Sequence, residues 1–163
     1  MEEVLIQNAV AYASQKDFHL AERLGFGIHG IIFVGEDKRG GGKTAIKAHR
    51  EQEPYLRELS VYTRLQQTGM TEILGLNLPQ LIGADDALRV IEMSIVARPF
   101  VLDFAGAYLD APPAFSDEIW TEWEVDKRDQ FDLHWPKAQA VLAALEEMGI
   151  YMVDVSPSNI AFV

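Results

Sequence analysis

Apolar and polar residues are interleaved in five short runs, and these runs predict β-strands. The runs are rich in β-branched, aromatic and other apolar residues, and most are bounded by glycine, aspartate or proline. They are residues 18–24, 31–37, 43–49, 78–83 and 88–96. Two glycine-rich turns join the first three runs and a turn at residues 84–86 joins the last two, so we expect a five-stranded antiparallel sheet.

Helices are predicted for four other segments. They are residues 2–15, 54–68, 116–132 and 136–148. In the second helix, Leu56, Leu59, Tyr62 and Leu65 are expected to form an apolar stripe against the sheet. Strands and helices that occur in separate blocks are typical of an α+β protein.

The composition fits one globular domain. Of 163 residues, 48% are hydrophobic and none is cysteine, so no disulfide or thiolate metal site is expected. The 25 acidic residues outnumber the 14 basic ones and give a net charge of −11, which disfavours nucleic acid as a partner. There is no apolar run of about 18 residues and the N-terminus is acidic, so we expect a cytoplasmic protein with no membrane partner.

The Gly-Lys-Thr sequence at residues 42–44 must be compared with a Walker-type phosphate-binding loop. That loop needs a glycine five positions before its second glycine, where this chain has Asp37. The residues after Thr44 also predict a strand, whereas the Walker loop is followed by a helix. We therefore interpret residues 38–42 as a flexible hairpin loop whose glycines can adopt positive φ.

A second glycine pattern, Gly25-x-Gly27-x-x-Gly30, lies between two predicted strands. A dinucleotide-binding turn would lie between a strand and a helix, so this position favours a glycine-rich flap over phosphates. Lys47 follows on the third predicted strand, and Glu58 follows on the next helix.

With a fourth motif, these features resemble the protein-kinase-like superfamily. "LGFGIHGIIFVG" is similar to its glycine-rich loop, "TAIK" to its strand-three lysine motif, "YLRELSVY" to its glutamate-bearing helix and "VDVSPSNIAFV" to its catalytic loop. The resemblance covers roughly residues 18–163. It implies one kinase-like domain over residues 1–163, with a five-stranded small lobe at about 1–96 and a shortened, mainly helical large lobe at about 97–163.

The resemblance also implies an ATP site. Gly25, Gly27, Gly30 and Ala45 would contact the nucleotide, and Lys47 would act in catalysis by neutralising the α- and β-phosphates.

Glu58 is the expected carboxylate partner of Lys47. It lies inside the amphipathic helix, whereas the rival residues Glu51 and Glu53 precede Pro54. We expect a partly buried ion pair in a wet cleft, from which either charge could reach solvent.

In the motif that resembles the catalytic loop, Asp154 would orient or deprotonate an acceptor hydroxyl, and Asn159 would bind Mg²⁺. The motif departs from the family pattern, because Met152 and Val153 stand where His and Arg are usual, and Ser156 stands where protein serine/threonine kinases commonly have lysine.

No Asp-Phe-Gly sequence follows Asn159, so the carboxylate that normally holds Mg²⁺ is not recognised. Two functions remain open. The first is an ATP-dependent phosphotransferase with a reduced catalytic loop. The second is a catalytically inactive kinase-like module, or pseudokinase, that binds a protein partner.

A shortened large lobe predicts an uncovered apolar surface in the C-terminal part of the chain. The residues expected there are Leu142, Leu145, Ile160, Phe162 and Val163. A protein partner or a second copy of the chain would cover them. Alternatively, the aromatic segment 115–134 folds back over them.

The four histidines are His19, His29, His49 and His134, and their spacing is unlike that of metal ligands. We expect structural roles for all four, with His29 at the tip of the glycine loop close to any ligand.

Overall fold

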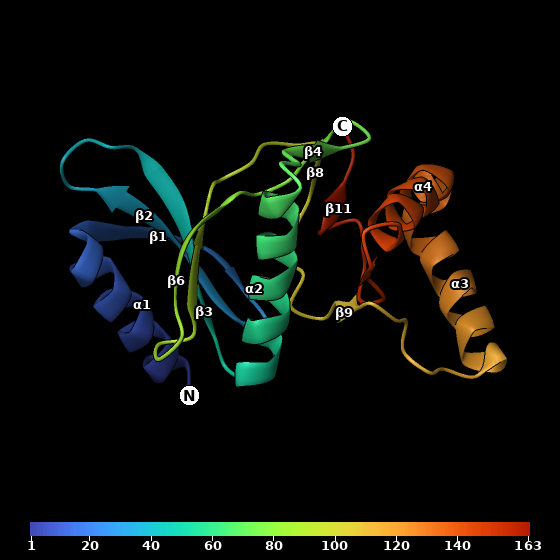
Figure 1. Ribbon diagram of the computed structural model, residues 1–163, viewed down its shortest axis with the longest axis horizontal. Helices are drawn as coiled ribbons and strands as arrows, with labels where there is room; N and C mark the ends of the chain where they lie inside the picture. Colours follow the sequence, from blue (N-terminus) through green and yellow to red (C-terminus); the bar gives the residue numbers. More distant parts are fainter.

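An antiparallel sheet with the strand order β1-β2-β3-β7-β6 forms the N-terminal part of the computed structural model, which describes residues 1–163 (Figure 1). Its strands are β1 (Phe18–Phe26), β2 (Gly30–Asp37), β3 (Lys43–His49), β6 (Leu81–Asp85) and β7 (Val90–Met93). The predicted five-stranded antiparallel sheet is therefore confirmed.

The last two strands begin and end at different residues from those predicted. The turn between them lies at residues 86–89, because the Asp85 carboxylate accepts a hydrogen bond from the Leu88 N–H at 2.9 Å. Arg89 has a φ of 54°, which completes the reversal of the chain. An aspartate side chain that bonds to the backbone a few residues later is a common way to close a turn.

Two helices cover opposite faces of the sheet. They are α1 (Glu2–Lys16) and α2 (Gln52–Gln67), which the structure has close to where the sequence predicts them. Alternate residues of β3 face the two helices, so Ile46 and Ala48 pack in the core beneath α1, whereas Ala45 packs in the core beside α2. Lys47 and His49 share the face of Ala45, and both contact α2.

The predicted apolar stripe of α2 is only partly correct. Its buried residues are Tyr55, Glu58, Val61, Tyr62 and Leu65. Leu56 is exposed, and Leu59 is half-buried. The prediction used a spacing of three residues throughout, which drifts by about 60° around the helix at each step, so four such positions cannot share one face.

The C-terminal part contains α3 (Asp117–Phe131), a short 3₁₀ helix η1 (Asp132–His134) and α4 (Trp135–Glu146). This part of the fold also involves six strands of two residues each. They are β4 (Glu72–Ile73), β5 (Leu76–Asn77), β8 (Phe100–Val101), β9 (Tyr108–Leu109), β10 (Ile150–Tyr151) and β11 (Ile160–Ala161). One small sheet has the order β11-β8-β5-β4, so it joins the end of the chain to the segment that follows α2.

Most of the apolar residues that were expected to be uncovered are in fact buried. Leu142, Leu145 and Ile160 have at most 7% of their surface exposed. Trp123 packs against the core cluster that contains all three, and it forms an edge-to-face contact with Trp135 at 6.0 Å. The alternative, in which the aromatic segment folds back, is thus the correct one for these residues.

The other two residues of that group differ. Phe162 is half-buried and stacks on His134 with ring centroids 4.8 Å apart, whereas Val163 is exposed. None of the helices has the length and apolar character needed to cross a membrane.

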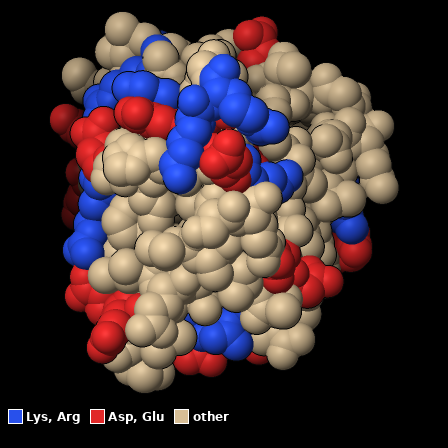
Figure 2. Space-filling model, turned by 90° about the vertical axis from the view of Figure 1, so that its left-hand side faces the viewer, with Lys and Arg blue, Asp and Glu red and all other residues tan.

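Charged residues on the face that Figure 2 shows alternate in sign. Ion pairs in this region link Lys38 to Asp17, Arg39 to Asp37 and Lys43 to Glu36. The basic side chains of the β2–β3 hairpin therefore have acidic neighbours and do not form a purely basic patch.

Candidate functional site

The glycine pattern forms the turn between β1 and β2. The Gly27 N–H donates a hydrogen bond to the Gly30 carbonyl at 3.0 Å. A Cβ at Gly30 would lie 2.0 Å from the carbonyl oxygen of Ala48, so the close approach of β2 to β3 requires glycine here. Gly25 lies at the end of β1, and a Cβ there would meet only the Ile32 side chain at 3.7 Å.

The β2–β3 connection is a hairpin, as predicted. Gly40 and Gly42 have positive φ, and the Asp37 N–H donates to the Gly42 carbonyl at 3.0 Å. Lys43 begins a strand and pairs with Glu36, so residues 42–44 do not form a Walker loop.

A cavity of about 340 Å³ lies beside the glycine turn. Its volume is within the range of about 300–1,000 Å³ that is typical of small-molecule sites. Its apolar lining includes Leu24, Ile32, Ala45, Met93 and Leu102. Its polar lining includes Lys47, Glu58 and Asp103.

A second groove, of about 360 Å³, lies between residues 74–76 and α4. It is lined by apolar residues such as Pro99 and Phe162, with Lys137 and His134 as its charged or titratable residues. This groove contains no carboxylate opposite its lysine. The smaller cavity, of about 340 Å³, is therefore the better candidate for a catalytic or nucleotide site.

Lys47 and Glu58 form the predicted ion pair, with the lysine Nζ 2.7 Å from the glutamate Oε1. The expectation of a wet cleft around this pair is wrong, because Lys47 is only 4% exposed and Glu58 is fully buried. The rival residues are not involved. Glu51 is exposed at the N-terminus of α2, and Glu53, which lies inside the helix and not before it, pairs with Arg57 on the surface.

The charges of this pair stabilise each other. Burial alone would raise the pKa of Glu58, but the Lys47 ammonium and a hydrogen bond from His49 outweigh burial and lower this pKa to about 2. Burial alone would lower the pKa of Lys47, but the carboxylates of Glu58 and Asp103 raise it above the usual lysine value. Both groups are therefore charged at neutral pH.

Asp103 is the site residue that the sequence prediction missed. Its Oδ1 lies 3.0 Å from Lys47 Nζ, and the N–H of the next residue, Phe104, donates to Glu58 Oε2 at 2.7 Å. An ammonium group has three N–H donors, and Glu58 and Asp103 use two of them. One donor of Lys47 remains for a ligand in the cavity.

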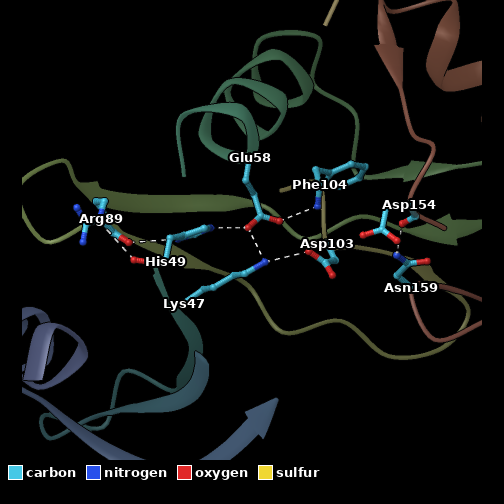
Figure 3. A network of polar contacts seen from close by, with 8 residues as sticks. All are labelled: Lys47, His49, Glu58, Arg89, Asp103, Phe104, Asp154 and Asn159. Carbon is cyan, nitrogen blue, oxygen red and sulfur yellow. Dashed lines mark hydrogen bonds and ion pairs between the residues drawn. The ribbon is translucent and has the colours of Figure 1, made fainter. Parts of the chain in front are cut away.

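Asp103 lies next to the loop that contains Asp154 and Asn159, as Figure 3 shows. Strand β8 pairs with β11, and the Leu102 N–H donates to the Asn159 carbonyl at 2.9 Å. A Cβ at Gly106 would lie 3.3 Å from the Cβ of Asp154. The segment 102–106 and the loop 154–159 are thus in direct contact.

The Asn159 side chain holds this loop in shape. Its Nδ2 donates to the Asp154 carbonyl at 3.0 Å, and its Oδ1 accepts from the Ser156 N–H at 2.8 Å. Trp123 Nε1 of α3 donates to the Val153 carbonyl at 2.7 Å, which attaches the loop to the helical part. The Asp154 side chain is exposed and free to meet a substrate.

A sequence signal for Asp103 does exist, but it occurs in an unexpected place. Residues 100–106 read Phe-Val-Leu-Asp-Phe-Ala-Gly, which is an apolar run followed by an aspartate, an aromatic residue and a nearby glycine. It precedes the loop 154–159 in the chain, whereas an Asp-Phe-Gly motif was sought after that loop. Comparison of the chain with protein-family models and with curated proteins gives no match, so the functional argument depends on this geometry.

Proposed function

We propose that this protein is a kinase-like, ATP-binding phosphotransferase that uses Mg²⁺. The observation that carries the proposal is the convergence of Lys47, Glu58 and Asp103 at one end of a partly apolar cavity, beside the loop of Asp154 and Asn159. The apolar end suits a purine base, and the third N–H of Lys47 suits a phosphate oxygen.

The donors near Asp103 fit a magnesium ion. Asp103 Oδ2 has no hydrogen-bond partner in the protein, and Asn159 Oδ1 accepts only one hydrogen bond, from the Ser156 N–H, so each oxygen has a lone pair for a metal. Carboxylate and amide oxygens are suitable ligands for Mg²⁺. No group of three or more acidic or histidine side chains is close enough to hold a metal without further ligands. Mg²⁺ is commonly bound by one or two carboxylates together with substrate phosphates, so we expect binding to require the nucleotide.

In this proposal Asp103 and Asn159 would hold Mg²⁺, and the ion would neutralise charge on the phosphates. Lys47 binds the phosphate oxygens, and Glu58 keeps the ammonium in position. Asp154 accepts the proton of an acceptor hydroxyl while the hydroxyl oxygen forms a bond to the γ-phosphorus. The bond between the γ-phosphorus and the oxygen that leaves with ADP breaks in the same step.

The alternative of an inactive, partner-binding module rested on a missing metal carboxylate. Asp103 lies where it could supply that carboxylate, which removes the main reason to prefer the inactive module. Phosphotransfer is therefore the function that we favour.

Binding and transfer can be tested separately. We expect isothermal titration calorimetry to show that ATP binds in the presence of Mg²⁺. Asp103→Asn should reduce the increase in ATP affinity that Mg²⁺ provides. Asp154→Asn should retain binding but lower the rate of transfer of γ-phosphate by about 10²-fold or more. Asp110→Asn is a matched control, because Asp110 is exposed and pairs with Arg64 away from the cavity. An unsubstituted protein that binds no nucleotide would refute the proposal.

A further inference from the structure

His49 lies between two hydrogen-bond acceptors and is completely buried. Its Nε2 is 2.8 Å from Glu58 Oε1, and its Nδ1 is 3.2 Å from the Arg89 carbonyl oxygen. A carbonyl oxygen and an ionised carboxylate can only accept hydrogen bonds. The Arg89 carbonyl already accepts the backbone N–H of His49, whereas the contact with Glu58 is a hydrogen bond only when Nε2 carries the hydrogen, so the geometry points to Nε2 as a donor to Glu58.

The surroundings of His49 hold the ring in place. Its neighbours in the buried cluster are Lys47, Glu58 and Asp103. Tyr55 of α2 packs edge-to-face on the imidazole with ring centroids 5.5 Å apart, and its hydroxyl donates to Asp86.

The backbone fixes His49 from the other side. The N–H of His49 donates to the Arg89 carbonyl at 2.9 Å, and Arg89 Nε donates to the His49 carbonyl. The ring is thereby attached to the turn between β6 and β7. Figure 3 shows the resulting series of contacts from Arg89 through His49 and Glu58 to Lys47.

The three groups that donate hydrogen bonds to the Glu58 carboxylate differ in whether they also belong to a proposed ligand-binding residue or its neighbour. Lys47 is the group that must contact a phosphate, and Phe104 is the neighbour of Asp103, which would bind the metal. His49 belongs to neither the phosphate-binding nor the metal-binding group. It is the donor whose position does not depend on the ligand.

From these contacts we infer that His49 is a positioning residue for phosphate binding, an inference that rests on the proposed function. His49 holds the Glu58 carboxylate in place through a contact that involves neither the phosphate nor the metal. Lys47 thereby keeps a fixed partner, and its third N–H is left for a ligand in the cavity.

Two substitutions of similar size test the contacts of the two ring nitrogens separately. The amide nitrogen of glutamine lies near the position of Nε2, so His49→Gln keeps a donor for Glu58. The amide nitrogen of asparagine lies near Nδ1, so His49→Asn keeps only the contact with Arg89. The readout is the ratio of the dissociation constants for adenosine and Mg·ATP, because adenosine has no phosphate for Lys47 to bind.

We expect His49→Asn to reduce this preference for ATP by about tenfold or more, the value for loss of a charged hydrogen bond, and His49→Gln to retain most of it. Lys47→Met gives the reference value for lost phosphate contact. A purely structural role would weaken adenosine and ATP binding equally, and would leave the ratio unchanged.

The outcomes distinguish this inference from the proposed function. If the unsubstituted protein prefers ATP and folded His49→Asn keeps the preference, the inference alone is overturned. If the unsubstituted protein binds neither ligand, the proposed function fails and the inference fails with it. Should His49→Asn not fold, ¹⁵N NMR of the unsubstituted protein decides, because a ring whose Nε2 carries no hydrogen would contradict the contact with Glu58 on which the inference rests.

Discussion

Replacement of Glu58 by glutamine tests whether the buried charge cluster stabilises the fold as its geometry indicates. The Glu58 carboxylate accepts three hydrogen bonds, from Lys47, His49 and the Phe104 N–H. An amide has one oxygen and one N–H₂ group, so in either orientation it sets a donor against another donor. Lys47 keeps Asp103 as a partner but loses the counter-charge of Glu58.

Removal of one partner from a buried ion pair costs about 3 to 5 kcal/mol. That is a large fraction of the roughly 5 to 15 kcal/mol by which a domain is stable. For a chain of this length it corresponds to a decrease in Tm of about 6 to 20 °C. Urea unfolding followed by circular dichroism, together with a thermal scan, would measure both quantities.

Glu53→Gln is the matched control, because Glu53 lies on the same helix and pairs with Arg57, but its side chain is 74% exposed. We expect this change to cost less than about 0.5 kcal/mol. A cost below about 1 kcal/mol for Glu58→Gln would mean that the carboxylate is solvated, and would refute the description of a closed charge cluster.

The same carboxylate should make stability depend on pH in the acid range. Its pKa is lowered from 4.5 to about 2 in the folded protein, so its contribution is fully present above about pH 4.5 and is lost as the pH falls toward 2. The difference in unfolding free energy between the unsubstituted protein and Glu58→Gln should shrink over that interval. A difference that stays constant down to about pH 3 would contradict the assignment.

Three further substitutions test the glycine turn and the loop at residues 154–159. Gly30→Ala should destabilise the protein by about 1 to 3 kcal/mol, since its Cβ would collide with the Ala48 carbonyl, whereas Gly27→Ala has nothing within 4 Å and should cost little in urea unfolding. Trp123→Phe removes the hydrogen bond to the Val153 carbonyl, and we expect a loss of about 1 kcal/mol of stability with a fall in kcat that exceeds the change in KM for ATP. Equal costs for the two alanine variants, or unchanged kcat for the tryptophan variant, would show that these contacts are unimportant.

The parts of the fold that depend on local contacts were predictable from the sequence. Strands β1, β2 and β3 are joined by short turns, and α4 has a regular apolar stripe that ends before Gly149. The pairing of Lys47 with Glu58 was expected from the resemblance, because Glu58 lies inside the helix that follows the strand of Lys47 in the chain.

The contribution of Asp103 was not predictable in the same way. It depends on the pairing of β8 with β11, two strands of two residues each that lie about 60 residues apart. Two residues show no periodicity, and long-range pairing leaves no local mark on the sequence. The burial of Lys47 was underestimated for a related reason, because the segment that closes over it comes from residues 102–104.

All three tryptophans lie within residues 120–135, and they form a continuous series of edge-to-face contacts. Trp123 in this series is bonded to Val153, the residue that precedes Asp154. Intrinsic fluorescence excited at the tryptophan band therefore reports on α3, α4 and the loop at residues 153–159, and contains no signal from the five-stranded sheet. Fluorescence would thus follow the C-terminal part alone, whereas far-ultraviolet circular dichroism follows the helices and strands of the whole chain, so coincident transitions would show that the chain unfolds as one cooperative unit.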